Sequence, residues 1–355
     1  MQKSYLVIGV MSGSSLDGLD LAACRFEHKE NTWDFSIKAT DFLPYEEKHR
    51  RDLSQLGNAS GIELIKAHAD YGTWTGEQVK LFIEKHGLNP DLIASHGHTI
   101  FHEPSQGFSF QLGSAAHIAA ACGLPCASDF RNTDMAHGGQ GAPLAPVSDF
   151  DLFPEYDVCV NLGGIANISY TDEDGQRLGY DITVCNLILN HLSIAFGEAY
   201  DKDGLFGKGG NLDSSLLLDL ESIDYYKHRG AKSIDKVWFY NHILPHFSKA
   251  SSSIEDQMHT AYIHIAKMIA THIEKAGQTS KVLLSGGGAK NKYLVQLIQE
   301  NTSTKICIPS DEIIDFKESL LMAYVGLLRL LEKTNSVSSV TGASEASSGG
   351  GIYLG

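Results

Sequence analysis

Apolar and polar positions along the first 45 residues follow the spacing of β-strands. An apolar run at residues 5–8 gives way to a polar, glycine-rich turn and resumes at residues 19–24, which predicts two strands joined by a tight turn. Alternation across residues 33–42 predicts a third strand. From residue 45 to about residue 85 the apolar positions recur at three- and four-residue steps, which predicts helix that ends at Gly87.

The second half of the chain repeats this opening pattern. Residues 158–170 read as strand, glycine turn and strand, a short strand ends at Asp181, and an apolar helix follows at residues 186–196. After a long amphipathic helix at residues 251–276, residues 281–292 read as a strand, three glycines and the start of a helix. Two similar units, one in each half of the chain, predict a duplicated domain.

A long polar, glycine-rich segment at residues 127–144 separates the two repeats, and we place the domain hinge near it. We therefore expect an α/β fold of two domains with a cleft between them. The first domain is expected to hold residues 1–135 and the C-terminal tail, about residues 332–355, and the second to hold residues 136–331.

Charge and composition narrow the classes of function. The formal net charge of -15 argues against non-specific binding to nucleic acid or to an anionic membrane, since both need a basic surface. No apolar run approaches the length of about 18 residues that a membrane span needs, and no signal peptide is expected. The six cysteines are scattered among apolar segments, which favours reduced thiols and a cytoplasmic location. The apolar helices are compatible with a homodimer, but the sequence does not specify the oligomeric state.

The first glycine turn has the composition of a phosphate-binding hairpin. Its glycines, at positions 9, 13 and 18, permit positive φ and close approach of a ligand, and its serines, at positions 12, 14 and 15, add hydroxyl donors. Asp17 and Asp20 suit a hydrated Mg²⁺ between the carboxylates and the phosphates. The turn matches neither a Walker loop nor a dinucleotide-binding motif. The alternative is a hairpin without a ligand.

Two later glycine turns extend this picture. The turn within residues 161–167 is a second candidate phosphate clasp. At residues 286–288 three consecutive glycines follow a strand, and their missing side chains leave room for a base or a ribose. A plain strand-to-helix turn rarely needs three glycines, so we favour a nucleotide site there.

Several polar side chains are candidates for substrate contacts. Histidines 96, 98 and 102 alternate along one strand face, but no HExxH motif or carboxylate partner supports zinc, so sugar or phosphate contacts are favoured over a metal. A hydrogen-bonded loop without a ligand is the alternative. Arg131 is suited to an anionic substrate group, unless it pairs with Asp129 at the surface. Asp181 lies between a strand and a helix, where either a catalytic carboxylate or a helix N-cap fits.

Five motifs together resemble the anhydro-N-acetylmuramic acid kinase family, within the sugar kinase, Hsp70 and actin superfamily. They are M-S-G-S-S-L-D-G-L-D (11–20), S-H-G-H-T-I-F-H (95–102), D-F-R-N-T-D-M-A-H-G-G-Q-G-A-P-L (129–144), V-N-L-G-G-I-A-N-I-S (160–169) and L-S-G-G-G-A-K-N (284–291). The resemblance covers nearly the whole chain. It implies a duplicated ribonuclease H-like fold and an ATP- and Mg²⁺-dependent enzyme of cell-wall recycling, which opens the 1,6-anhydro ring of anhydro-N-acetylmuramic acid with water and phosphorylates O6.

The resemblance also implies roles for individual residues. Asp181 takes the place of the catalytic base that activates the water. The sugar contacts fall on Arg131, His96, Glu318 and Asn186. The ATP contacts fall on Gly13, Ser14, Ser15, Leu16, Asp17, Gly18, Leu19, Asp20, Gly163, Gly164, Asn167, Gly286, Gly287 and Gly288, with Asp17 also a candidate Mg²⁺ ligand.

The chain departs from the family pattern directly after Asp181. The family has Thr-Gly-Pro-Gly-Asn there, whereas this chain has Ile-Thr-Val-Cys before Asn186. The loss of two glycines and a proline changes the backbone conformations open to this segment and leaves the exact sugar undecided. The alternatives are a kinase of the same fold that phosphorylates an ordinary hydroxyl of another sugar, and a nucleotide-gated binding module without turnover.

Overall fold

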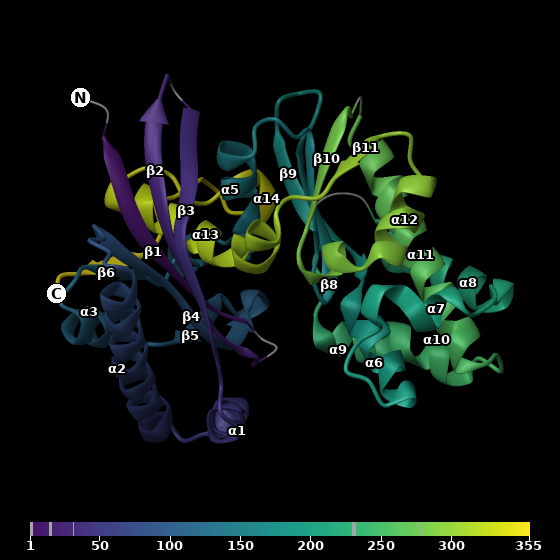
Figure 1. The fold of residues 1–355 in the computed structure, drawn as a ribbon, viewed down its shortest axis with the longest axis horizontal. Helices are drawn as coiled ribbons and strands as arrows, with labels where there is room; N and C mark the ends of the chain where they lie inside the picture. Colours follow the sequence, from purple (N-terminus) through teal and green to yellow (C-terminus); the bar gives the residue numbers. More distant parts are fainter. Residues whose placement is uncertain (1–2, 14–15, 31, 229–231, 278) are drawn as a thin grey trace. The chain divides into compact units, whose positions relative to one another are not determined.

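A computed structural model of the chain describes residues 3–13, 16–30, 32–228, 232–277 and 279–355 (Figure 1). The predicted ATP contacts Ser14 and Ser15 lie outside these residues. The chain forms two compact units. Unit 1 consists of Met1–Phe153 and Phe316–Gly355, and unit 2 of Pro154–Asp315.

The sheet of unit 1 has the strand order β12-β6-β4-β1-β2-β3, with β5 paired to β4. The first three strands are antiparallel neighbours, whereas β4 runs parallel to β1 and β6 parallel to β4. The strands are β1 (Ser4–Ser12), β2 (Gly18–Lys29), β3 (Thr32–Pro44), β4 (Leu92–Glu103), β5 (Phe108–Leu112), β6 (Cys126–Ser128) and β12 (Gly351–Tyr353).

The sheet of unit 2 repeats this topology with the order β11-β10-β7-β8-β9. Its first three strands are again antiparallel, and its last two run parallel to β7. The strands are β7 (Val158–Leu162), β8 (Ile165–Thr171), β9 (Arg177–Val184), β10 (Lys281–Ser285) and β11 (Lys305–Cys307). The order β3-β2-β1-β4-β6 in unit 1 matches β9-β8-β7-β10-β11 in unit 2, which confirms the predicted duplicated α/β fold.

Helices cover both faces of the sheet in unit 1. Because side chains alternate along β1, the Ile8 side packs on α2 and α3, whereas the Gly9 side meets α13 (Figure 1). The longest helix, α2, begins with a capping box between Ser60 and Glu63 and ends at Gly87, where φ is 60°. The helices are α1 (Glu47–Gln55), α2 (Gly61–His86), α3 (Ala115–Cys122), α4 (Asn132–Ala136), α5 (Ala145–Leu152), α13 (Asp311–Leu330) and α14 (Ser338–Thr341).

In unit 2 the predicted long amphipathic helix is α11, whose apolar side packs into the core with β7, β8 and β9. The α-helices of this unit are α6 (Asn186–Ser193), α7 (Leu205–Lys208), α8 (Ser214–Glu221), α9 (Lys236–Trp238), α10 (Leu244–Lys249), α11 (Ile254–Lys275) and α12 (Lys292–Glu300). A π-helical turn, η6 (Phe239–Ile243), joins α9 to α10. Across the described ranges, no helix is both long and apolar enough to cross a membrane.

The units divide at residues 153 and 316, whereas the sequence analysis placed the domain bounds at residues 135 and 331. Side-chain contacts join α5 and α13 to each other within unit 1. Lys317 of α13 forms an ion pair with Asp149 of α5 at 2.7 Å, and both side chains are buried. The hydroxyl of Tyr324 donates to Asp151 at 2.7 Å.

Gly9 is needed for close packing rather than for an unusual backbone conformation. The sequence predicts positive φ at Gly9 and Gly18, but both residues lie in strands and neither has positive φ. A Cβ at Gly9 would lie 1.8 Å from the backbone oxygen of Ser319, and one at Gly18 would lie 2.3 Å from that of Leu43. The positive φ near the hairpin instead falls on Leu16, at 62°.

We expect Gly9→Ala to lower the free energy of unfolding by about 3 kcal/mol, because α13 cannot approach β1 once a methyl group intervenes. Urea unfolding followed by circular dichroism measures the change. Gly61→Ala is the matched control, since a Cβ at Gly61, the first residue of α2, meets nothing within 4 Å. An equal midpoint for Gly9→Ala and Gly61→Ala would contradict the packing argument.

Candidate active site

Asp181 belongs to a polar row that crosses the sheet of unit 2. The register pairs Ser285 with Asn161, Asn161 with Asn167, and Asn167 with Asp181. Because directly paired residues point to the same face, these side chains form one row. The opposite face carries the apolar residues of the core, including Ile168 and Val160. The row therefore places the candidate base beside two side-chain amides.

The structure corrects the predicted end of this strand. β9 continues past Asp181 to Val184, and the N-cap of α6 is Cys185, so Asp181 is not a helix cap. The register with β8 shifts next to Asp181, so that Ile182 is an extra residue on β9. Such a β-bulge bends a strand and re-aims the neighbouring side chain, and bulges are enriched next to active sites.

The segment before α9 holds Asp181 in place. The backbone N–H of Ile234 donates to Asp181 Oδ2 at 2.8 Å, and the N–H of Asp181 donates to the carbonyl of Lys232 at 3.0 Å. The hydroxyl of Tyr225 donates to the carbonyl oxygen of Asp181 at 2.7 Å. These bonds fix the backbone and one carboxylate oxygen, which leaves Oδ1 to accept a proton.

Burial raises the pKa of Asp181 to about 6, although the Ile234 N–H and the Lys232 charge oppose the rise. Asp181 is therefore a carboxylate at neutral pH and a stronger base than an exposed aspartate. Lys232 donates to the carbonyl of Tyr225 at 3.2 Å, and its Nζ lies 4.4 Å from the centre of the Tyr225 ring. Burial lowers the pKa of Lys232 to about 8, so the side chain is still mainly a cation at neutral pH.

The second glycine turn is fastened to the start of α6. The carbonyl of Gly163 accepts the N–H of Asn186 at 3.1 Å, and the carbonyl of Gly164 accepts the N–H groups of Cys185 and Leu187 at 2.9 and 3.1 Å. The side-chain amide of Asn186 donates to the Leu162 carbonyl at 2.9 Å. The turn and the helix end thus form one rigid corner beside the polar row.

Each residue of the triple glycine serves a different purpose. Gly286 has a φ of 78°, and a Cβ there would lie 2.5 Å from Asn161 Oδ1. A Cβ at Gly288 would lie 2.8 Å from the Cβ of Leu162, whereas one at Gly287 would meet nothing within 4 Å. Gly286 and Gly288 therefore let this turn approach β7, and Gly287 leaves open space.

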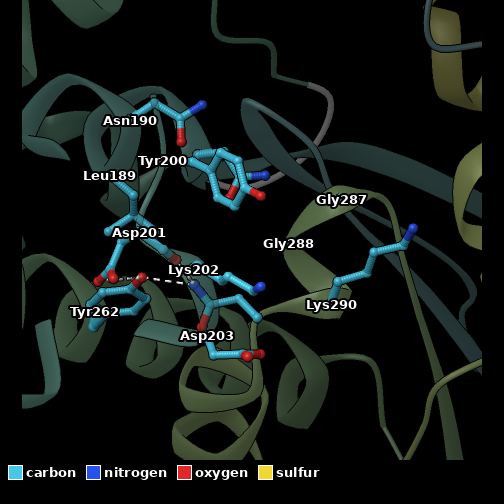
Figure 2. A pocket seen from close by; sticks show the side chains of 12 residues that line it. Leu189, Asn190, Tyr200, Asp201, Lys202, Asp203, Tyr262, Gly287, Gly288 and Lys290 are labelled. Carbon is cyan, nitrogen blue, oxygen red and sulfur yellow. Dashed lines mark hydrogen bonds between the residues drawn. The ribbon is translucent and has the colours of Figure 1, made fainter. Parts of the chain in front are cut away.

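Gly287 and Gly288 line a pocket of about 450 Å³ within unit 2 (Figure 2). This volume lies in the range of small-molecule sites. The glycine-rich loop at residues 200–211 was not predicted as part of a site, because its proximity to the triple glycine is visible only in three dimensions. The other lining residues are Asn186, Leu189, Asn190, Tyr200, Asp201, Lys202, Asp203, Tyr262, Lys290 and Asn291.

Asp201 stabilises one wall of this pocket. Its side chain is buried and accepts the N–H groups of Phe206 and Gly207, each at 3.0 Å, and the Tyr262 hydroxyl at 3.1 Å (Figure 2). Asn291 donates to the same hydroxyl at 2.7 Å. Because hydrogen bonds within the protein occupy the Asp201 carboxylate, its role is to stabilise the wall of the pocket.

In unit 1, Arg131 and His96 are brought together although they are far apart in sequence. Arg131 Nη2 donates to His96 Nε2 at 2.9 Å, and its Nη1 donates to the Gly141 carbonyl at 2.7 Å. Burial and the Arg131 charge lower the pKa of His96 to about 3, so the imidazole is neutral. His96 Nδ1 therefore donates to the Gly97 carbonyl at 2.9 Å. The predicted alternative of an Asp129–Arg131 pair is not formed, and Glu318 is an exposed residue of the same unit.

The other histidines of β4 have separate partners. Nδ1 of His98 hydrogen-bonds with the Ser12 hydroxyl at 3.0 Å, and Nδ1 of His102 with the Ser109 hydroxyl at 3.2 Å. The Tyr45 hydroxyl also donates to Ser12, at 2.7 Å. Among the described residues, no three histidine, cysteine or acidic side chains are placed to hold a metal together.

Around the first hairpin, Asp17 is exposed, and its backbone carbonyl accepts the N–H of Tyr45 at 3.0 Å. The N–H of Leu16 donates to the Gly13 carbonyl at 3.3 Å. The Asp17 carboxylate faces water, where it can contact a hydrated cation through that cation's water shell.

Comparison with known proteins supplies independent evidence. The family model described as "Anhydro-N-acetylmuramic acid kinase" matches residues 5–355. The anhydro-N-acetylmuramic acid kinase of Mannheimia succiniciproducens is 34% identical over 99% of this chain and 100% of that protein. The protein of the same name from Pseudomonas syringae pv. syringae is 32% identical over 83% of this chain and 84% of its own length. The chain therefore belongs to the anhydro-N-acetylmuramic acid kinase family.

Proposed function

We propose that this protein uses ATP to convert anhydro-N-acetylmuramic acid and water into N-acetylmuramic acid 6-phosphate. Family membership across residues 5–355 supports the substrate. The observation that carries the chemistry is the setting of Asp181, with one carboxylate oxygen held by the Ile234 N–H and a pKa raised to about 6. We propose that the reaction is a step of cell-wall recycling, as the family's substrate implies. We place it in the cytoplasm, because all six cysteines are free thiols.

The proposed reaction couples ring opening to phosphoryl transfer. A water oxygen attacks C1 of the sugar while Asp181 Oδ1 takes the water's proton, and the C1–O6 bond breaks. The electron pair left on O6 attacks the γ-phosphorus of ATP, the bond to the β-phosphate oxygen breaks, and ADP leaves. One water and one phosphoryl group are thereby added to the sugar.

Arg131 is the proposed contact for the lactyl carboxylate. Its guanidinium is oriented by Gly141 and His96, so little conformational freedom is lost when it binds an anion. His96 is neutral and therefore adds no competing charge. Glu318 is proposed to accept a hydrogen bond from a sugar hydroxyl.

The pocket beside Gly287 is the proposed adenosine site, and Asn186 lies in its wall. The hairpins at Gly13–Asp20 and Gly163–Gly164 are proposed to bind the phosphates through backbone N–H groups, as glycine turns do in other nucleotide sites. Mg²⁺ is proposed to neutralise the phosphate charge, with Asp17 contacting its water shell.

We expect Gly287→Leu to raise the KM for ATP by about tenfold or more without changing the melting temperature. Gly287 lines the pocket, and a Cβ at this position meets no protein atom within 4 Å, so a larger side chain there takes up space in the pocket. Initial rates at varied ATP measure the effect, and the KM for sugar is expected to stay the same. An unchanged KM for ATP would remove the pocket from the nucleotide site.

We expect kcat/KM for the sugar to fall as pH drops below about 6, because Asp181 must be deprotonated to act as a base. The charge of Lys232 lowers the pKa of Asp181, so Lys232→Met should move this acidic limb to higher pH. Lys232→Arg keeps the charge and should restore the wild-type profile. A limb at the same pH in Lys232→Met would exclude Lys232 as a determinant of the Asp181 pKa.

A further inference from the structure

Unit 2 has a second pocket, of about 650 Å³, which the proposed reaction does not use. It lies between the short helix η5 (Asp224–Lys227) and the helical segment that runs from α9 to α10. Its lining includes Tyr225, Trp238, Asn241, His242, His246 and Lys249. None of these residues belongs to the pocket beside Gly287.

One side of this second pocket is an aromatic cluster. The rings of Trp238 and His242 are stacked, with centroids 5.2 Å apart and an angle of 28° between their planes. The Tyr225 ring lies 5.0 Å from that of Trp238. Tyr225 and Trp238 are only half-buried, so the cluster presents ring surface to the pocket. Half-exposed aromatic rings of this kind suit the apolar face of a pyranose or another ring.

The backbone between these rings is unusual. Residues 239–243 form a π-helical turn, η6, and Asn241 and His242 of this turn line the pocket. π-Helical turns are rare and are found frequently at functional sites. The turn places an amide and an imidazole beside the aromatic cluster, where they can hydrogen-bond to hydroxyl groups of a ligand.

Basic side chains line this pocket, although the protein as a whole is acidic. The chain as a whole has a formal net charge of -15, but the pocket is lined by Lys249 and by histidines at positions 228, 242 and 246. Its one acidic lining residue, Asp224, is paired with Lys227 at 2.7 Å. This local excess of basic groups favours an anionic ligand.

We infer that this pocket binds an anionic pyranose, whose ring contacts the cluster of Tyr225, Trp238 and His242 and whose carboxylate or phosphate lies near Lys249 and His246. The inference goes beyond the proposed reaction and does not rest on it. Tyr225 connects the two sites, because its ring lines this pocket and its hydroxyl donates to the backbone carbonyl of Asp181 at 2.7 Å.

Calorimetric titration of the full chain tests the inference with four probes: glucose 6-phosphate, glucuronate, methyl glucoside and inorganic phosphate. The experiment uses an Arg131→Ala background, which removes the proposed sugar contact of unit 1. At least one anionic sugar is expected to bind more tightly than both methyl glucoside and phosphate, and comparing the two anionic sugars distinguishes phosphate from carboxylate recognition. If inorganic phosphate binds as tightly as both anionic sugars, the inference is overturned.

Three variants locate the binding. Trp238→Ala and Lys249→Met should each weaken the preferred anionic sugar by about fivefold or more, since each removes one of the two kinds of contact. Tyr240→Ala is the matched control, because Tyr240 is an aromatic residue of the same π-helical turn that is 56% exposed and does not line the pocket. If Trp238→Ala does not fold, Lys249→Met still tests the inference, because Lys249 is exposed. Unchanged affinity in Lys249→Met contradicts the inference.

Discussion

Asp181→Asn is expected to lower kcat by about 10³-fold while ATP still binds with nearly wild-type affinity. The amide has the same shape as the carboxylate and can still accept the Ile234 N–H, but it cannot take a proton from water. Quenched-flow or coupled-enzyme rates measure kcat, and calorimetry with a non-hydrolysable ATP analogue measures binding.

Asp174→Asn is the control for this prediction, since Asp174 is an exposed residue of the turn before β9. It should leave kcat unchanged. Residual activity of Asp181→Asn within about tenfold of wild type would exclude Asp181 as the base, because general-base catalysis contributes at least about 10²-fold.

Arg131→Ala is expected to raise the KM for the sugar by about 100-fold, with a much smaller effect on the KM for ATP. The variant loses affinity for the sugar for two reasons. It lacks a charge-assisted, bidentate contact, and it leaves the substrate carboxylate unpaired. Arg131→Lys should recover little of the loss, because a lysine cannot reach His96, Gly141 and a ligand with a planar fork.

Arg51→Ala serves as the control, since Arg51 is an exposed arginine of α1 in the same unit. Both KM values should stay at wild-type levels in that variant. If Arg131→Ala leaves the KM for sugar unchanged, Arg131 does not contact the substrate.

Much of the fold was readable from the sequence because its signals are local. The alternation of apolar residues and the glycine turns predict the antiparallel strands β1–β2 and β7–β8, and their repetition predicts the duplicated topology. The end of α2 at Gly87, a left-handed residue, was predicted in the same way.

The parts that were missed depend on contacts between distant segments. The bond that fixes Asp181 comes from Ile234, 53 residues later, and the Arg131–His96 pair spans 35 residues. The requirement for glycine at position 9 depends on α13, which begins about 300 residues later in the chain. No local pattern carries such information, because packing partners are chosen by the fold as a whole.

The departure from the family pattern after Asp181 also has a structural explanation. Ile182, Val184 and Cys185 are almost completely buried and join the core of unit 2. Their burial anchors the end of β9 beside Asp181. The apolar sequence thus stabilises a strand and a bulge at this place, a local structure that is compatible with a catalytic carboxylate.

The most direct test of the proposed reaction is the mass of the product formed from ATP, Mg²⁺ and anhydro-N-acetylmuramic acid in ¹⁸O-labelled water. A control incubates unlabelled product in the same water, since the anomeric oxygen of a reducing sugar exchanges slowly. The expected product is heavier than the substrate by one phosphoryl group and one water, with ¹⁸O present above the exchange control. A product that gains a phosphoryl group but no water would show that the enzyme phosphorylates a hydroxyl without opening the ring, and would contradict the role given to Asp181.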